Sequence, residues 1–226
     1  MTSKQPNVLK RFTPLVAAID MLVNERLALL NPASWTDTND VAFLSEYGRQ
    51  RGATRLFAAC FTQAPETYHH WQVFAGSNEG VCVEFDRGAL LGALLDDDSY
   101  YWRDMEYVTI EKLRARRSLA LEDLPFLKRW GYRDEQEFRL IHECRAESPP
   151  RIHHVPIKRA WITRIVLNPW LSEGLADGVK LALRSLPGCG KLKVARTTLI
   201  DNARWKAALG DVEDYAPILG PPPKAI

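Results

Sequence analysis

The chain lacks a hydrophobic run long enough to cross a membrane. It has 226 residues, and its longest apolar stretches, such as residues 16–23, are broken by charges such as Asp20. A transmembrane helix needs roughly 20 consecutive apolar residues, so none is expected. The first nine residues also lack the basic start, apolar stretch and small-residue cleavage site of a secretory signal. We therefore expect a cytoplasmic protein with no membrane partner.

The chain also lacks an excess of charge of either sign. Its 30 Lys and Arg residues nearly balance its 28 Asp and Glu residues, which leaves a net charge of +2, and the basic residues are spread along the chain. A dedicated nucleic-acid binder needs a concentrated basic surface that follows phosphates. The sequence therefore carries no strong nucleic-acid signal.

Cysteine and metal-binding patterns are sparse. The four cysteines lie far apart, and three of them, Cys60, Cys82 and Cys144, occur in apolar runs; the fourth is Cys189. Reduced thiols in such runs behave as small hydrophobic groups, so we expect structural thiols rather than disulfides or nucleophiles. The five histidines form no C-x-x-C or H-E-x-x-H set, so no metal site is predicted.

Three common catalytic and nucleotide-binding motifs are missing. The sequence contains no G-x-S-x-G elbow, no G-x-x-x-x-G-K-[ST] loop and no G-x-G-x-x-G after a strand. Residues 188–191 imitate the end of a phosphate loop but lack its upstream glycine and its final Ser or Thr. We interpret them as a turn.

The composition is that of an ordinary globular domain. Hydrophobic residues make up 46% of the chain and charged residues 26%, which argues against disorder or a fibrous repeat. The length is ample for one core. We predict an N-terminal extension over residues 1–8, a single domain over residues 9–210 and a proline-rich C-terminal tail over residues 211–226.

Apolar periodicity predicts helices and strands that alternate irregularly. Thr13 and Pro14 are typical of a helix N-cap and first helical residue. The apolar stripe of this helix would comprise Leu15, Ile19, Leu22 and Val23. Further helices are predicted through residue 47, after polar cap residues at 36–40, and at residues 65–75, 90–95 (capped by Asp86), 111–121, 124–130 and 172–185. Strands are predicted at residues 26–30, 55–61, 81–85, 106–110, 137–144, 155–157, 161–167 and 191–195. This order predicts an α+β fold with a mixed, mostly antiparallel sheet flanked by helices.

Two glutamates form the candidate catalytic pair. Glu135 and Glu137 flank Gln136 where a polar segment enters the predicted strand at residues 137–144. If both belonged to the strand, their side chains would share one face, about 6–7 Å apart. Such a pair suits a reaction that passes through an oxocarbenium-like state, because one carboxylate stabilises the cation and the other orients the acceptor. With 14 glutamates in the chain, however, roughly one Glu-x-Glu pair is expected by chance.

Several blocks, in order, resemble the bacterial family known as domain of unknown function 2971. The blocks are LKRFTPLVAAIDMLVNERLALLNPASWTD, AACFT, HHWQVFAGSNEGVCVEFD, DEQEFRLI and ITRIVLNPWL. The resemblance covers most of residues 9–200. The chain departs from the family at residues 36–38, where Thr-Asp-Thr replaces Asn-Asp-Pro.

A more distant resemblance connects the chain with ADP-ribosyltransferases of the arginine–serine–glutamate type. It rests on the short opening strand, the Ile- and Leu-rich helix and the Glu-x-Glu at the start of a late strand. It implies that Arg11 binds NAD phosphate or ribose, that Thr62 replaces the bracing serine, that Glu137 is the catalytic glutamate and that Glu135 is the acceptor-side carboxylate. Lys10, beside Arg11, leaves the phosphate ligand ambiguous.

Each site assignment has a structural alternative. The alternative for Arg11 is a surface charge ahead of a helix cap, and the alternative for Thr62 is a residue that only ends its strand. His70 and Trp71 are candidates to stack on an adenine or nicotinamide ring, but a partly buried aromatic helix face explains them nearly as well. Arg139 is expected to pair with a carboxylate across the sheet, either Glu84 or Glu137.

Three functions follow from these candidates. The first is an enzyme of bacterial defence or toxin type that uses NAD as substrate, as an ADP-ribosyltransferase with a macromolecular acceptor or as an NAD glycohydrolase. The second is a non-enzymatic nucleotide- or protein-binding module with an aromatic groove around His70, Trp71 and Trp130. The third is a glycosidase or nuclease that uses the two carboxylates. The first requires Arg11, Thr62 and Glu137 to converge on one cleft.

Overall fold

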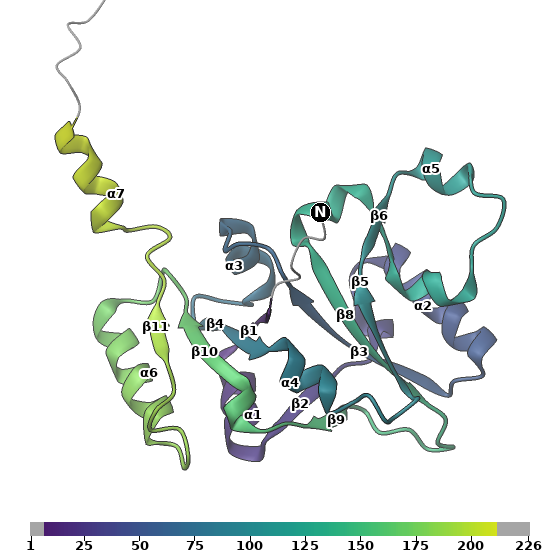
Figure 1. The fold of residues 1–226 in the computed structure, drawn as a ribbon, viewed down its shortest axis with the longest axis horizontal. Helices are drawn as coiled ribbons and strands as arrows, with labels where there is room; N and C mark the ends of the chain where they lie inside the picture. The colour runs from purple at the N-terminus through teal and green to yellow at the C-terminus, as the bar shows by residue number, and fades with distance from the viewer. Residues whose placement is uncertain (1–6, 212–226) are drawn as a thin grey trace, which may run out of the picture.

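A seven-stranded sheet forms the centre of the molecule (Figure 1). The computed structural model describes residues 7–211. The strand order is β11-β10-β4-β1-β3-β8-β5, and neighbouring strands are antiparallel except for the parallel pair β10–β11. This confirms the predicted single α+β domain with a mixed, mostly antiparallel sheet. The predicted extension and proline-rich tail lie almost entirely outside the described residues.

The strands and helices alternate along the chain, as predicted. The strands are β1 (Val8–Pro14), β2 (Arg26–Leu29), β3 (Arg55–Thr62), β4 (Gly80–Asp86), β5 (Tyr100–Asp104), β6 (Glu106–Val108), β7 (Leu127–Arg129), β8 (Glu137–Cys144), β9 (His153–Pro156), β10 (Ile162–Leu167) and β11 (Val194–Arg196). The α-helices are α1 (Leu15–Asn24), α2 (Thr38–Arg51), α3 (Tyr68–Phe74), α4 (Arg87–Gly92), α5 (Ile110–Arg114), α6 (Glu173–Ser185) and α7 (Ala203–Ala207). Short 3-10 helices span Pro32–Ser34, Leu121–Phe126, Trp130–Glu135, Arg159–Trp161 and Ala208–Asp211. Strands β2 and β9 pair with each other, as do β6 and β7.

Side-chain caps set the start of two predicted helices. The Asp37 carboxylate accepts hydrogen bonds from the backbone N–H groups of Asn39 and Asp40 and so begins α2. Asp86 accepts from the N–H of Ala89 at the start of α4. These bonds satisfy N–H groups that have no partner within the helix, which is why acidic residues are favoured there. Both predicted caps are confirmed.

The first helix differs from its predicted form. Thr13 is the penultimate residue of β1, and α1 begins at Leu15 without a side-chain cap. Its buried residues are Ala18, Met21 and Leu22, whereas Ile19 is 36% and Val23 50% exposed. Because α1 is apolar around most of its circumference, spacing alone does not define the face that packs on the sheet.

The region between residues 100 and 130 is also less helical than predicted. Only the short α5 and a 3-10 helix containing Pro125 form where two longer helices were expected, and β7 occupies residues 127–129. Pro125 has no backbone N–H and its ring crowds the preceding turn, so an α-helix cannot continue through it from residues 121–124. Strand β5 was not predicted; it is an edge strand that pairs with β8.

The central sheet has a seam between β1 and β3. Strand β1 pairs with β4 over seven residues and β3 pairs with β8 over eight, but β1 and β3 share a single registered pair, Lys10 opposite Thr62. The two halves of the sheet therefore diverge beyond that pair. Hydrophobic clusters cover both faces of the sheet, one beneath α1, α4 and α6 and the other beneath α2. The seam is the place where backbone and side chains leave room for a ligand.

Candidate active site

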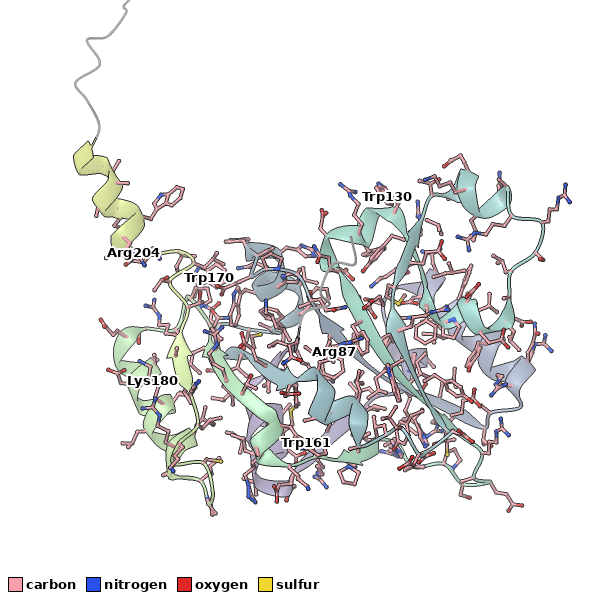
Figure 2. All side chains as sticks on the ribbon, viewed as in Figure 1. Arg87, Trp130, Trp161, Trp170, Lys180 and Arg204 are labelled. Atoms are coloured by element: carbon pink, nitrogen blue, oxygen red, sulfur yellow. The ribbon has the colours of Figure 1, made fainter. Side chains whose placement is uncertain are left out.

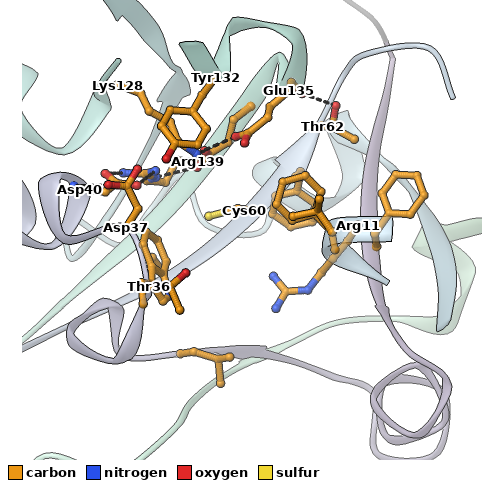
Figure 3. A pocket seen from close by; sticks show the side chains of 18 of the residues that line it. Arg11, Thr36, Asp37, Asp40, Cys60, Thr62, Lys128, Tyr132, Glu135 and Arg139 are labelled. Atoms are coloured by element: carbon orange, nitrogen blue, oxygen red, sulfur yellow. Dashed lines mark hydrogen bonds and ion pairs between the residues drawn. The ribbon is translucent and has the colours of Figure 1, made fainter. Parts of the chain in front are cut away.

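A cavity of about 440 Å³ opens at this seam (Figure 3). Ligand sites commonly have volumes of roughly 300–1,000 Å³, so a small molecule fits here. The walls come from β1, β3 and β8, from the segment that precedes and begins α2, from the end of α3 and from the β7 region. The lining residues are Lys10, Arg11, Phe12, Leu30, Trp35, Thr36, Asp37, Asp40, Ala58, Cys60, Phe61, Thr62, Val73, Phe74, Lys128, Tyr132, Glu135, Glu137 and Arg139.

The sheet brings three of the predicted site residues to this cavity from three adjacent strands. Arg11 lies on β1, Thr62 ends β3 and Glu137 begins β8, and all three line the cavity. Thr62 and Glu137 are directly opposite each other in the β3–β8 register. The residues are far apart in the sequence, and the strand order β1-β3-β8 makes them neighbours.

Glu137 is a buried carboxylate held between two cations. Its Oε1 accepts from Arg139 Nε at 2.7 Å, and its Oε2 accepts from Lys128 Nζ at 2.8 Å. Its backbone N–H donates to the Tyr107 hydroxyl at 2.7 Å. Burial alone would raise the pKa of Glu137, but the charges of Arg139 and Lys128 outweigh it and lower the pKa to about 2. Glu137 is therefore anionic at neutral pH.

Arg139, a buried neighbour on β8, fixes the position of the Glu137 carboxylate. It is fully buried and forms a bidentate pair with Asp40, at 2.8 and 2.7 Å, and donates to the Pro125 carbonyl at 2.8 Å. Of the two predicted partners, Glu137 is confirmed. Glu84 pairs instead with Arg164 across β4 and β10, at 2.7 Å. The bidentate pair with Asp40 fixes the guanidinium of Arg139 in one orientation.

Glu135 is not part of the strand, and the prediction that strand geometry aligns it with Glu137 is wrong. Glu135 ends a 3-10 helix, and Gln136 adopts a left-handed conformation with φ 40°. The two carboxylates nevertheless meet, because Glu135 Oε2 also accepts from Lys128 Nζ, at 2.6 Å. Burial raises the pKa of Glu135, and Lys128 only partly opposes this effect. Glu135 is therefore the more easily protonated member of the pair.

Thr62 ties the Glu135 segment to the end of β3. Its hydroxyl donates to the Glu135 carbonyl at 2.5 Å and accepts from the Ala64 N–H at 3.0 Å (Figure 3). Thr62 is buried, so both bonds are shielded from water. It ends its strand, as the structural alternative predicted, and in doing so it also braces the segment that carries Glu135.

Arg11 is a cation with a buried nitrogen in this cavity that is unpaired within the described part of the chain. One of its terminal nitrogens donates to the Ala28 carbonyl at 3.4 Å, while Nη1 is buried and has no partner among residues 7–211. Lys10, its neighbour on β1, also lines the cavity and donates to the Ala64 carbonyl at 2.8 Å. Figure 3 shows Arg11 apart from the Glu135–Arg139 cluster, with Cys60 between them. An anion beside Arg11 would satisfy a donor that the protein leaves unpaired.

The structure does not bring His70 and Trp71 to the cavity. His70 stacks on Phe12 with ring centroids 5.2 Å apart, and Trp71 packs edge-on against the same ring and donates to Glu66 at 2.7 Å. Both are at most 2% exposed. Val73 and Phe74, one turn further along α3, line the cavity in their place. His70 and Trp71 thus form a buried aromatic face of α3 against Phe12, and neither side chain lines the cavity.

Trp130 does not complete an aromatic groove either. It is 48% exposed, carries Arg133 over its ring and lies near the outer edge of the molecule (Figure 2). It does not line the cavity, and neither do His70 and Trp71. The groove predicted for the binding-module hypothesis therefore does not form around these three residues.

Four residues of the site carried no recognisable signal in the sequence. Lys128 lay within a predicted helix, Tyr107 within a predicted strand, and Asp40 within a predicted cap. Cys60 was expected to be buried like Cys82 and Cys144, but it is partly exposed in the cavity wall. Burial raises the pKa of the Cys60 thiol, so the thiol is protonated at neutral pH. No pattern of local spacing could have grouped these residues.

Among residues 7–211, no cluster of three or more His, Cys, Asp or Glu side chains has an arrangement suited to a metal ion. Within the same residues, every helix is too short or too polar to span a bilayer.

Comparisons with known proteins identify only distant structural similarity. No protein family and no curated protein matches the chain, so the resemblance to domain 2971 stays a prediction. Among solved structures, DarT from Thermus sp. 2.9 in complex with NAD+ matches with a TM-score of 0.47 at 14% identity, covering 87% of this chain and 98% of that one. The same protein matches in complex with ADP-ribosylated ssDNA, with a TM-score of 0.46 at 15% identity over 87% and 97% of the chains, and in complex with carba-NAD+, with 0.44 at 13% over 86% and 97%. At these values the similarity does not say what this chain binds, so its function has to be inferred from its own residues.

Proposed function

We propose that this protein cleaves the bond between nicotinamide and ribose in NAD and passes the ADP-ribose to a macromolecular acceptor or to water. One observation carries the proposal: Arg11, Thr62, Glu135 and Glu137 meet in one cavity at the β1–β3 seam. Arg11 on the first strand and Glu137 at the start of a late strand match what the resemblance to ADP-ribosyltransferases implies, Thr62 stands in place of the serine, and Glu135 precedes the late strand in a 3-10 helix. The charges of the site also suit this reaction.

Bond cleavage creates positive charge where Glu137 offers negative charge. When the C1′–N bond breaks, its electron pair leaves with nicotinamide, which departs neutral, and the ribose becomes an oxocarbenium-like cation. A carboxylate that is anionic at neutral pH stabilises this cation electrostatically. Each Glu137 oxygen already accepts one hydrogen bond, and a carboxylate oxygen can accept two, so both remain able to hold ribose hydroxyls.

Glu135 is suited to the acceptor side of the reaction. The acceptor oxygen or nitrogen bonds to C1′ and loses a proton, which needs a nearby base. Burial raises the pKa of Glu135 above that of an ordinary carboxyl, and a base is more effective when its pKa approaches the working pH. Glu137 stabilises the cation and Glu135 takes the proton, so the two carboxylates have different tasks.

Arg11 is suited to the pyrophosphate of NAD. It lies across Cys60 from the carboxylates, and its buried Nη1 has no partner among the described residues. A guanidinium binds phosphate oxygens through parallel N–H groups. The cavity thus offers a guanidinium for the phosphates and, on the other side of Cys60, two carboxylates paired with Lys128 and Arg139 for the ribose next to nicotinamide.

The variant Glu137→Gln tests the proposal. It removes the charge but keeps the shape, so nicotinamide release from NAD should fall at least about 100-fold, as for lost electrostatic stabilisation elsewhere. Nicotinamide release is measured by chromatography, and NAD binding by calorimetry. Binding should persist in the variant, because Arg11 and the cavity walls are unchanged.

Glu143→Gln is the matched control. Glu143 lies on the same strand, is equally buried and is also paired with arginine, but it does not line the cavity. This variant should cleave NAD at the wild-type rate. Equal losses in the two variants would point to damage of the sheet, and a wild-type protein that leaves NAD intact with every acceptor tested would refute the enzymatic proposal.

A further inference from the structure

The backbone does not assemble the Glu135–Glu137 pair. Residues two apart in a strand share a face, but the left-handed conformation of Gln136 interrupts that alternation. The two carboxylates are joined instead by one ammonium group, since Lys128 Nζ lies 2.6 Å from Glu135 Oε2 and 2.8 Å from Glu137 Oε2. The pairing is therefore a tertiary interaction.

Strand pairing, an aromatic ring and burial fix the position of Lys128. It lies on β7, directly opposite Tyr107 of β6, whose hydroxyl accepts from the Glu137 N–H. Its ammonium group lies 4.8 Å from the centre of the Tyr132 ring, and its side chain is only 11% exposed. The small β6–β7 sheet thus contacts Glu137 at the start of β8 through two side chains. Lys128 binds the carboxylate of Glu137, and the Tyr107 hydroxyl accepts from its backbone N–H.

The two glutamates depend on Lys128 to different degrees. Glu137 also pairs with Arg139, whereas Lys128 is the only salt-bridge partner of Glu135 within residues 7–211. Without Lys128, the Glu135 carboxylate would face the negative charge of Glu137 in a buried setting. Like charges at this separation disfavour ionisation of one of them.

We infer that Lys128 is a positioning residue that makes Glu135 and Glu137 a functional pair and favours the ionised form of Glu135 for its role toward the acceptor. The catalytic consequence rests on the proposed function, but the pairing itself does not. Lys128 touches neither the breaking bond nor the acceptor in this scheme. It acts through Glu135.

Titration of Glu135 gives a direct readout. Burial raises its pKa and Lys128 opposes this rise, so loss of Lys128 should raise the pKa further. The charged and titratable groups near Glu135 are Lys128 on β7, Glu137 and Arg139 on β8, Asp40 on α2, His69 on α3, Tyr107 on β6 and Tyr132. Removal of Lys128 changes only one of these charges.

The experiment compares wild type with Lys128→Met by ¹³C NMR titration of the glutamate carboxyl carbons, assigned with Glu135→Gln and Glu137→Gln. The pKa of Glu135 should rise by about one to three pH units in the variant. The acidic limb of the pH profile for ADP-ribose transfer should move by the same amount. Nicotinamide release should be affected less, because Glu137 keeps Arg139.

Two further variants keep this test sharp. Lys128→Arg retains the charge and should restore the profile, and Lys180→Met, on the distant helix α6, should leave it unchanged (Figure 2). If Lys128→Met does not fold, Lys128→Gln gives the same comparison with a similar length. An unchanged pKa of Glu135 would overturn the inference. A shifted pKa in a protein that does not cleave NAD would refute the proposed function alone.

Discussion

The two ends of β8 carry the same kind of group with different surroundings. Glu143, near the end of the strand, accepts from the Tyr47 hydroxyl at 2.5 Å, from Arg51 at 2.8 Å and from Arg145 at 3.0 Å. Glu137, at its beginning, is equally buried and also paired with cations, but it faces a cavity. Hydrogen bonds and side chains surround Glu143 and leave no room for a ligand.

This comparison shows that burial and ion pairing do not by themselves mark a functional carboxylate. At both positions, cations outweigh the effect of burial and lower the pKa of the glutamate. Perturbed titration is common to structural networks and active sites. The difference comes from the seam between β1 and β3, which lies beside Glu137 and far from Glu143.

The largest expected effect on stability distinguishes Arg139, which pairs with Glu137, from Arg51, which pairs with Glu143. Arg139→Met removes a fully buried guanidinium and leaves Asp40 and Glu137 without it, so the free energy of unfolding should fall by about 3–5 kcal/mol. Arg51→Met affects a guanidinium that is 30% exposed and should cost only about 1 kcal/mol. Urea denaturation measures both. Equal losses of unfolding free energy in the two variants would contradict the expectation that the ion pairs around Glu137 are the more deeply buried.

The pH dependence of stability gives a smaller effect that concerns Glu137 itself. Its folded pKa of about 2 lies below the unfolded value of about 4.3, so its ionised form stabilises the fold above the unfolded pKa. That contribution, on the order of 3 kcal/mol, is lost as the pH falls through the folded pKa. Glu137→Gln should therefore lose stability at pH 7, and the difference from wild type should shrink toward pH 2. A difference that is constant with pH would contradict the assignment.

Arg11→Met should have the smallest effect on stability and a clear effect on binding. The Arg11 Nη1 is buried without a partner, so its removal should leave the free energy of unfolding within about 1 kcal/mol of wild type, or raise it. If Arg11 binds the NAD phosphates, the dissociation constant for NAD should rise at least about tenfold, as expected for a lost charged hydrogen bond. Calorimetry and urea denaturation separate the two effects. Large destabilisation with unchanged binding would make Arg11 a purely structural residue.

Local patterns predicted the parts of this protein in which neighbouring residues decide the outcome. The strand at residues 137–144, the buried strand predicted at residues 55–61 and found at Arg55–Thr62, and the caps at Asp37 and Asp86 all follow from short-range chemistry. Prediction was wrong for the face of α1 and for residues 111–130, where packing partners and Pro125 determine the structure. Edge strand β5 exists because β8 offers it a pairing partner.

For the candidate site too, some features were available from the sequence and others only from the structure. The residue types of Arg11, Thr62, Glu135 and Glu137 and their order along the chain were available from the sequence, and so was a short list of reactions that such residues can perform. His70 and Trp71 satisfied the same criterion of residue type, but α3 turns them toward Phe12 and turns Phe74 toward the cavity. Residue type alone was not sufficient to predict the cavity lining, because the direction in which each side chain points also decides it.

The sequence alone determined most of the strands, several helices, the α+β class and the carboxylates, because helix caps, strand alternation and residue chemistry act over a few neighbouring positions. Only the tertiary structure decided that β1 and β3 separate after one registered pair, and that Lys128, Arg139 and Asp40 gather around Glu135 and Glu137. These contacts join segments up to about a hundred residues apart. Their formation depends on strand order and packing, which no local pattern encodes.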